Sequence, residues 1–403
     1  MTAEGITLAQ ARRLALRCQG LDGSWDLPPG KEGAAEVLQR LGYVQLDTIA
    51  VVERAHHHVL WSRRYDYEPS MLEQLQWPDR RVFEYWTFAA SYLPIGDYRY
   101  YRPRMQSYAV SPRAREWREA HADMVAEVLA RVRAEGPVTT SEFGAREVSA
   151  GSWWDRRPAR QALDHLFSAG ELMVARRRGF QRVFDLTERV LPADLDTTPP
   201  DESEMGRFLV RRHLAAHGAT AAREVGRGLH CQTTIEAAIR ELTLSGDVRA
   251  IEVEGIGPRW VLTRALADLD EPEPHGPPVH ILSPFDNLVI DRQRLRRLFG
   301  FDYALECYLP EERRKFGFFV LPILFEGRFV GRMDVRADRP TLALLVRNLS
   351  MEPGVRIDAE LVDALADRIA EFAAFNRCGQ VRVERADPGD LAVALTRRLV
   401  DLP

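Results

Sequence analysis

The sequence predicts an α+β protein in which helical units, each closed by a β-hairpin, precede a C-terminal antiparallel β-sheet or barrel. Two observations support this fold class. Between residues 119 and 268, a helix, a Gly-containing break, a short helix, a longer helix and a two-stranded hairpin occur twice in succession. Beyond a Pro-rich linker at 269–278, short apolar segments rich in β-branched residues alternate with turns.

The composition indicates a globular protein of several domains. The chain has 403 residues, of which 45% are hydrophobic and 28% charged, with a net charge of −4. At roughly 150 residues per domain, this length predicts two to four domains and excludes a disulfide miniprotein. No stretch reaches the ~18 apolar residues of a transmembrane helix. The start, MTAEGITLAQARR, lacks the basic and apolar regions of a signal peptide, so we expect a cytoplasmic, nucleoid-associated protein.

The first hundred residues predict two helices and a strand. Residues 6–19 have apolar side chains at helical spacing, and Thr7 is suited to cap that helix. A second helix is expected at 34–42. The segment YVQLDTIAVV, at 43–52, is rich in β-branched residues and bounded by Gly42, which predicts a strand or a strand-like turn.

The internal repeat indicates tandem helix-turn-helix units. Residues 134–143 align with 216–225, and residues 162–179 align with 238–255. The longer helix of each copy stops at Gly170 or Gly246, a residue type that favours the left-handed conformation after a helix. A hairpin follows in both copies. Three short helices and a hairpin form the winged-helix plan, in which the hairpin is the wing.

The residues beyond the linker predict the C-terminal domain. Strands are expected at 316–325, 327–335 and 341–350, joined by short turns, and one amphipathic helix at 357–375. The four cysteines lie far apart without a CxxC pair. They indicate reduced thiols and neither bridges nor zinc ligands.

Three short motifs carry side chains suited to chemistry. In Gln45-Leu46-Asp47, an extended strand would place the amide and the carboxylate on one face, where a carboxylate can activate water. The alternative is a polar strand edge. The run 84–86 combines an acid with two aromatic rings that could stack on a base, and its alternative is a core cluster in which Glu84 pairs with Arg80 or Arg81. The histidines 56–58 suit a cleft or a packed core better than a metal site, because consecutive residues cannot converge on one ion.

Arginine supplies nearly all of the positive charge. Only Lys31 and Lys315 are lysines, and arginines cluster with aromatic residues at 98–105, 111–118, 153–160 and 175–182. The last two clusters coincide with the longer helix and the wing of the first repeat. This composition favours phosphate contacts and stacking, so we expect a nucleic acid as the partner. The alternative is a solvated surface in an arginine-rich protein.

Several blocks in sequence order resemble the winged-helix DNA glycosylases of the AlkZ and YcaQ type. They are GYVQLDTI, ERAHHHVLWSR, FEYW, GSWWDRRPAR with GFQRVFDLTERVLP, ILSPFDNLVIDR, LECYLP and FVGRMD. The resemblance implies three winged-helix domains, which we place at 1–118, 119–200 and 201–268, and a C-terminal β-barrel-like domain at 279–403.

The resemblance also implies a function. It indicates a monofunctional, monomeric DNA glycosylase without metal or cofactor, which hydrolyses the N-glycosidic bond of N7-alkylguanine-type purines and unhooks interstrand crosslinks in double-stranded DNA. The Gln-apolar-Asp motif of the YcaQ branch assigns catalysis to Gln45 and Asp47. The lesion-pocket residues implied are Glu84, Tyr85, Trp86 and His57. The residues expected to contact DNA are Arg54, Arg63, Arg157, Arg160, Arg176, Arg177 and Arg178.

One departure from the family pattern leaves an alternative function open. The family often has EYWxHEA, whereas this chain has EYWTFAA, with Phe88 and Ala89 in place of a histidine and an acid. This loss could change the lesion preference or slow catalysis. It is also the best argument for a non-catalytic winged-helix regulator or repair accessory protein. A protein–protein scaffold is a third reading, but a scaffold has no need of arginine-rich wings.

Overall fold

The computed structural model describes residues 4–143, 156–226, 231–267, 269 and 278–400. The chain forms two compact units, of which unit 1 comprises Met1–Glu68 and Leu209–Pro403, and unit 2 comprises Pro69–Phe208. Both contain helices and strands, so the protein is α+β. Among the described residues, no helix is long and apolar enough to cross a membrane.

The N-terminal segment of unit 1 begins with strand β1 (Glu4–Ile6) and helix α1 (Leu8–Cys18). Thr7 caps α1, as expected, because its hydroxyl accepts from the Gln10 amide while the Gln10 side chain accepts from the Thr7 amide. The remaining elements of this segment are α2 (Gly30–Leu41), β2 (Val44–Gln45) and α3 (Ala55–Trp61). Within the segment 43–52, where a longer strand was expected, only the two residues of β2 form a strand.

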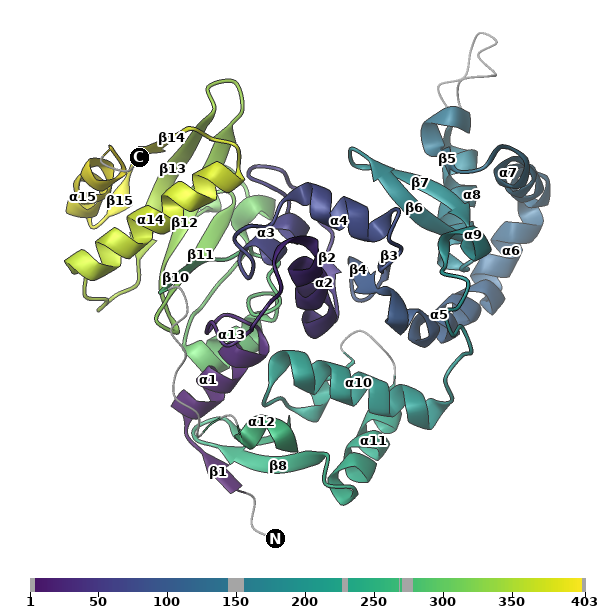
Figure 1. Ribbon diagram of the computed structural model, residues 1–403, viewed down its shortest axis with the longest axis horizontal. Helices are drawn as coiled ribbons and strands as arrows, with labels where there is room; N and C mark the ends of the chain where they lie inside the picture. Colours follow the sequence, from purple (N-terminus) through teal and green to yellow (C-terminus); the bar gives the residue numbers. More distant parts are fainter. Residues whose placement is uncertain (1–3, 144–155, 227–230, 268, 270–277, 401–403) are drawn as a thin grey trace. The chain divides into compact units, whose positions relative to one another are not determined.

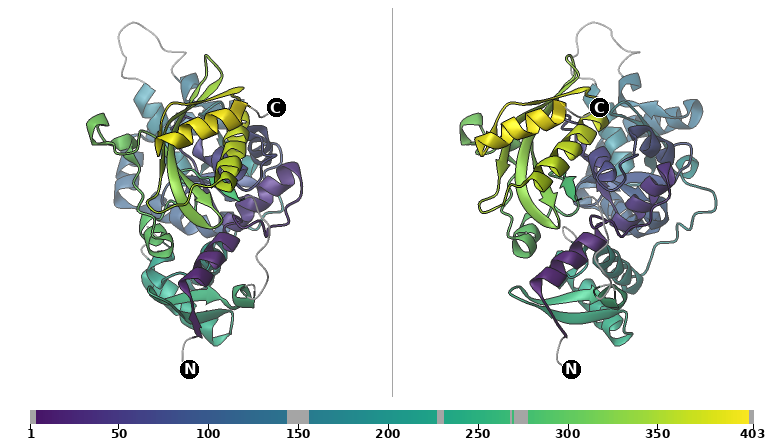
Figure 2. Two further views of the ribbon diagram at one scale, coloured as in Figure 1. Left: turned by 90° about the vertical axis from the view of Figure 1, so that its left-hand side faces the viewer. Right: turned by 60° about the vertical axis from the view of Figure 1, so that its left-hand side comes forward.

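The second copy of the repeat lies mainly in unit 1. Its elements are α10 (Glu202–His217), the 3₁₀ turn η3 (Ala222–Glu224), α11 (Gln232–Leu244), the hairpin β8 (Val248–Val253) and β9 (Gly257–Leu262), and α12 (Thr263–Ala267). Strand β1 pairs in parallel with β8, so the start of the chain completes this three-stranded sheet (Figure 2). Apolar residues of α1, of 210–265 and of 282–329 share one buried core, which explains why these remote segments fold together.

The C-terminal part of unit 1 is built on a six-stranded sheet. Its elements are β10 (Val279–Ile281), α13 (Arg292–Phe299), η4 (Glu306–Tyr308), η5 (Glu311–Arg313), β11 (Val320–Phe325), β12 (Arg328–Asp338), β13 (Ala343–Met351), α14 (Ala359–Phe375), β14 (Gln380–Val383), β15 (Ala386–Asp387) and α15 (Gly389–Val400). Helix α14 lies across one face of this sheet (Figure 1). The expected strands and helix are confirmed. The expected antiparallel sheet is confirmed for β10 to β13, whereas β14 and β15 run parallel to β13, so the sheet as a whole is mixed.

Unit 2 contains the first copy of the repeat. Its elements are α4 (Pro69–Gln76), β3 (Val82–Trp86), β4 (Ala90–Pro94), η1 (Ile95–Asp97), α5 (Tyr98–Val110), α6 (Pro112–Ala120), α7 (Ala122–Glu135), β5 (Val138–Thr139), η2 (Thr140–Phe143), α8 (Arg156–Ser168), β6 (Leu172–Arg178), β7 (Gln181–Leu186) and α9 (Thr187–Val190). Strands β3 and β4 form one hairpin, and β6 and β7 form another.

The two copies of the repeat share their order of elements. In the first copy β5 pairs with β7, and in the second Thr220 forms the corresponding bridge to Trp260 on β9. Gly170 and Gly246 follow the longer helices with φ of 77° and 82°, the left-handed conformation expected of them. The internal repeat is therefore confirmed at the level of secondary structure. The longer loop expected in the first copy, and the linker at 270–277, lie outside the described residues.

Candidate active site

The Gln45–Asp47 motif follows a sharply ended helix. Helix α2 stops at Gly42, which has φ of 79° and donates to the Leu38 carbonyl. A side chain at this position would also collide with Arg212, because a Cβ atom would lie 2.8 Å from the Arg212 Cδ. Glycine thus lets the chain turn directly into β2.

Long-range hydrogen bonds hold the segment on both sides of the motif. The Asn287 side-chain amide donates to the Tyr43 carbonyl at 3.1 Å. Beyond the motif, the Ala337 amide of β12 donates to the Val51 carbonyl at 2.9 Å, and the Glu53 amide donates to Asn376 Oδ1 at 2.6 Å. These bonds explain why β2 is short: the backbone after the motif bonds to distant loops and strands and forms no longer ladder of its own.

Asp47 is a half-buried carboxylate with one oxygen engaged. Its Oδ1 accepts from the Ile49 amide at 2.7 Å. Burial raises the pKa of Asp47 above its ordinary value of 3.8, and the Ile49 hydrogen bond opposes that rise. A carboxylate with a raised pKa is a stronger base than one in water, which suits proton abstraction from a water molecule.

Gln45 is buried, and its side-chain oxygen has no hydrogen-bond partner among the described residues. Its side chain is 8% exposed, and no donor from the described residues reaches its Oε1 atom. An unsatisfied buried amide oxygen is costly unless a water or ligand bonds to it. Gln45 and Asp47, both in unit 1, therefore form a short polar segment between apolar neighbours, with Leu46 buried between them.

Two of the histidines of α3, His57 and His58, bond to separate partners. The His57 Nδ1 atom lies 2.7 Å from the Tyr67 hydroxyl, and His58 Nε2 bonds to the Ile281 carbonyl at 2.8 Å. Burial, followed by the charges of Arg54 and Arg377, lowers the pKa of His57 to about 3, so its ring is neutral. Among the described residues, no group of three or more side chains suited to a metal is found.

Sequence reasoning assigned no role to the 3₁₀ turn η4, which faces the motif. Tyr308 is 75% exposed. Burial raises the pKa of the Cys307 thiol, and the negative charge of Asp47 raises it further. Burial and the Asp47 charge also raise the pKa of the Tyr308 phenol. The turn is anchored by buried Glu306, whose Oε2 accepts from the Phe316 and Gly317 amides. The LECYLP block was the only sequence signal for this turn.

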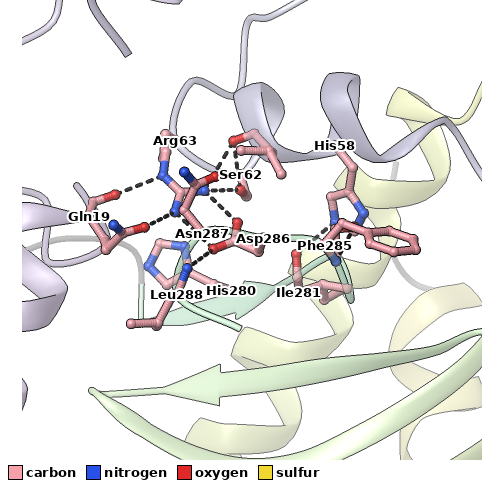
Figure 3. A network of polar contacts seen from close by, with 12 residues as sticks. Gln19, His58, Ser62, Arg63, His280, Ile281, Phe285, Asp286, Asn287 and Leu288 are labelled. Atoms are coloured by element: carbon pink, nitrogen blue, oxygen red, sulfur yellow. Dashed lines mark hydrogen bonds and ion pairs between the residues drawn. The ribbon is translucent and has the colours of Figure 1, made fainter. Parts of the chain in front are cut away.

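The structure places Arg63, which was expected to contact DNA, in the interior of unit 1. Its guanidinium is fully buried and pairs with Asp286, with an Nη1–Oδ2 distance of 2.6 Å. It also donates to the Gln19 carbonyl and to Gln19 Oε1, so it joins α1, α3 and the loop before α13 (Figure 3). A guanidinium with these partners holds unit 1 together and is not available to a phosphate.

The structure places Glu84, Tyr85 and Arg177, expected at the lesion pocket and at DNA, inside unit 2. Glu84 is buried and accepts from Arg177 of the β6–β7 hairpin at 2.6 and 2.7 Å. Tyr85 is buried, and its hydroxyl donates to the Ser168 carbonyl at 2.7 Å. The core alternative describes these residues, although the arginine that pairs with Glu84 differs from the two expected. Trp86, in contrast, is 38% exposed.

The other predicted DNA contacts differ in exposure. Arg160 and Arg178 have exposed side chains, which lie 3.8 Å from the Asp164 carboxylate and 3.6 Å from the Glu142 carboxylate respectively. Arg54 and Arg176 are half-buried. The side chain of Arg157 lies outside the described part of the structure.

Comparison with known proteins identifies the family. A family model described as DNA glycosylase AlkZ-like matches residues 38–375. Among solved structures, the Streptomyces sahachiroi DNA glycosylase AlkZ is similar in fold, with a TM-score of 0.63 and 18% identity, over 94% of this chain and 100% of that one. The family match includes the Gln45–Asp47 motif, and it confirms the resemblance seen in the sequence. The chain belongs to the AlkZ-like family of DNA glycosylases, whose substrate is DNA and whose role is in DNA repair.

Proposed function

We propose that this protein is a monofunctional glycosylase that excises N7-alkylguanine-type purines and unhooks interstrand crosslinks. The observation that carries the proposal is that Asp47, a half-buried carboxylate of raised pKa, lies two residues after Gln45, whose buried Oε1 atom has no hydrogen-bond partner among the described residues. The tandem winged helices and their exposed arginines, Arg160 and Arg178, would supply contacts to the DNA backbone.

The chemistry needs few groups because the leaving base is already a cation. When the C1′–N9 bond breaks, its electron pair neutralises the alkylated base and leaves an oxocarbenium-like sugar. The Asp47 carboxylate stabilises this cation and takes a proton from the attacking water as oxygen bonds to C1′. Gln45 Oε1 accepts a hydrogen bond from the same water or from the sugar. The proton then passes from Asp47 to solvent, and the products are a free base and an abasic site.

Excision by Asp47 variants tests this assignment. On duplex DNA that contains N7-methylguanine, Asp47→Asn should slow abasic-site formation by on the order of 10²-fold or more, measured at saturating enzyme on a gel. Gln45→Ala should slow it less, because it removes orientation and no charge. The control is Asp26→Asn, an exposed carboxylate outside the motif. If folded Asp47→Asn excises at the wild-type rate, the non-catalytic DNA-binding reading becomes the better account.

Borohydride trapping tests the monofunctional part of the proposal. A lyase would join a lysine to the abasic sugar through a Schiff base, and the chain has only Lys31 and Lys315. We expect no trapped protein–DNA adduct during active excision. An adduct that disappears in Lys31→Arg or Lys315→Arg would contradict this part and leave the glycosylase assignment intact.

A further inference from the structure

The turn that joins β3 to β4 presents two aromatic side chains to solvent. Trp86, the last residue of β3, pairs with Ala90, so Phe88 lies at the middle of a three-residue turn. Trp86 is 38% exposed and Phe88 is 45% exposed. Glu84 and Tyr85, earlier on the same strand, are buried. Adjacent exposed aromatic residues mark a contact surface more often than a free one.

Hydrogen bonds fix the backbone of this turn. The Thr87 amide donates to the Ala89 carbonyl at 2.9 Å, and the Thr87 hydroxyl lies 3.1 Å from that of buried Ser91. A backbone held in this way presents its aromatic rings with little entropy left to lose on binding. The turn is therefore suited to rigid insertion and less suited to a moving lid.

A cation lies at the base of the same turn. Arg104 of α5 donates through Nη1 to the Trp86 carbonyl at 3.0 Å and to the Thr87 carbonyl at 2.5 Å, and its side chain remains exposed. Helix α6, which packs against α5, carries exposed Arg113 and Arg115. Aromatic rings can stack on the bases of a nucleic acid, and guanidinium groups can bind its phosphates. Two apolar rings beside guanidinium groups are therefore suited to bind a nucleic acid.

We propose that Trp86 and Phe88 form an aromatic wedge that inserts into the base stack of duplex DNA beside the target nucleotide, with Arg104 on the adjacent phosphate. Apolar side chains between base steps unstack them and kink the duplex. Phe88 stands at the histidine position of the EYWxHEA pattern, which makes the wedge of this chain more apolar. The inference deepens the proposed function and rests on duplex DNA as the ligand, while it moves Trp86 from a lesion pocket to the neighbouring base step.

Binding measurements on full-length variants test the wedge. The probe is a duplex with N7-methylguanine on a 2′-fluoro sugar, which resists excision, and 2-aminopurine next to it. Trp86→Ala and Phe88→Ala should each weaken binding at least about fivefold, the lower end for loss of base–aromatic stacking. The dependence of affinity on salt should not change, because no charge is lost. Arg104→Gln should instead lower the salt slope by about one.

The fluorescence of 2-aminopurine separates a wedge from ordinary surface contact. Wild-type protein should raise the emission as the neighbouring step unstacks, and the two alanine variants should not. Trp77→Ala is the matched control, since Trp77 is also 38% exposed in unit 2 but lies outside the turn. Thermal melting shows that each variant is folded.

The outcomes distinguish this inference from the proposed function. Wild-type affinity and emission in Trp86→Ala and Phe88→Ala would overturn the wedge, while excision of ordinary N7-methylguanine by the same proteins would leave the glycosylase proposal standing. A protein that shows the wedge signals without excising any base would support the wedge and contradict the proposed activity.

Discussion

Arg63 and Asp286 show how burial decides what a charged side chain does. Both are 0% exposed, and the pair has further hydrogen bonds to Gln19 and Ser62. Removing one partner of such a pair leaves an uncompensated charge in the interior, which is far more costly than the pair itself is stabilising. Arg63 therefore belongs to the stability of unit 1.

Substitution of Arg63 should lower stability and leave the electrostatics of DNA binding unchanged. We expect Arg63→Met to reduce the free energy of unfolding by about 3–5 kcal/mol in urea titrations. The double variant Arg63→Met/Asp286→Leu should recover part of that loss, because no buried charge remains. A stable Arg63→Met protein with a reduced salt slope of DNA binding would restore the original assignment of Arg63 to phosphate.

The charge of Asp47 should lower stability while it serves catalysis. Because burial raises its pKa in the folded protein, the ionised form is less favourable there than in the unfolded chain. Asp47→Asn should therefore raise the melting temperature at neutral pH, and the gain should disappear as the pH falls below the folded pKa and wild-type Asp47 is protonated. Excision by the wild type should decline over that same acidic range.

Thermal melts and excision rates across pH measure both effects, with Asp26→Asn as the control. A neutral-pH melting temperature of Asp47→Asn below that of the wild type would show that the charge is satisfied in the folded state. The pKa argument would then be wrong.

At the scale of elements, two neighbouring arginines of the β6–β7 hairpin have different environments. Arg177 has an 8% exposed side chain and pairs with Glu84, whereas Arg178, the next residue, is 58% exposed. Alternation along a strand sends successive side chains to opposite faces. One face of the hairpin therefore fixes unit 2, and on the other face Arg178 is exposed.

Single substitutions in this hairpin should have different effects at the two arginines. Arg178→Gln should weaken duplex binding and lower the salt slope by about one, with an unchanged melting temperature. Arg177→Met should lower stability by about 3–5 kcal/mol, because buried Glu84 would lose its close cation and keep the neutral Gln76 amide at 3.1 Å and Arg182 at 3.9 Å. Glu84→Gln in the Arg177→Met background should rescue folding. Equal effects of both arginine substitutions on binding and none on melting would contradict this division.

The elements predicted from sequence are those set by local patterns. Helical spacing located α1, α2 and α14, and the glycines after α8 and α11 marked the ends of these helices. The strand predicted at 43–52 was too long, because the Val51 carbonyl and the Glu53 amide form hydrogen bonds with residues about 290 to 320 positions away. The burial of Arg63 and Glu84 also depends on partners remote in sequence, and a charged side chain alone predicts exposure. The sequence did not predict a role for Tyr308, because only folding brings η4 close to Asp47.

At the scale of the whole molecule, DNA binding should depend strongly on salt and weakly on sequence. The net charge is −4, so attraction to DNA has to come from clustered arginines such as those of α5, α6 and the β6–β7 hairpin. Arginine–phosphate contacts release counterions, and log Kd should change linearly with log salt at a slope of about 0.9 per contact. Titrations on several duplex sequences measure both properties. Affinity that does not change with salt would exclude backbone contacts as the main source of binding.

The interrupted path of the chain through unit 1 has a consequence for synthesis on the ribosome. Residues 69–208 emerge as a complete unit, whereas the apolar residues of α1 share a core with residues 210–329. At about 5–20 residues per second, synthesis of 209–403 takes roughly 10–40 s. During that time the N-terminal helices have no completed core. Unit 2 should therefore fold first, and nascent chains arrested far enough beyond residue 208 for unit 2 to clear the ribosomal exit tunnel should yield a protease-resistant fragment of 69–208 while residues 1–68 remain digestible.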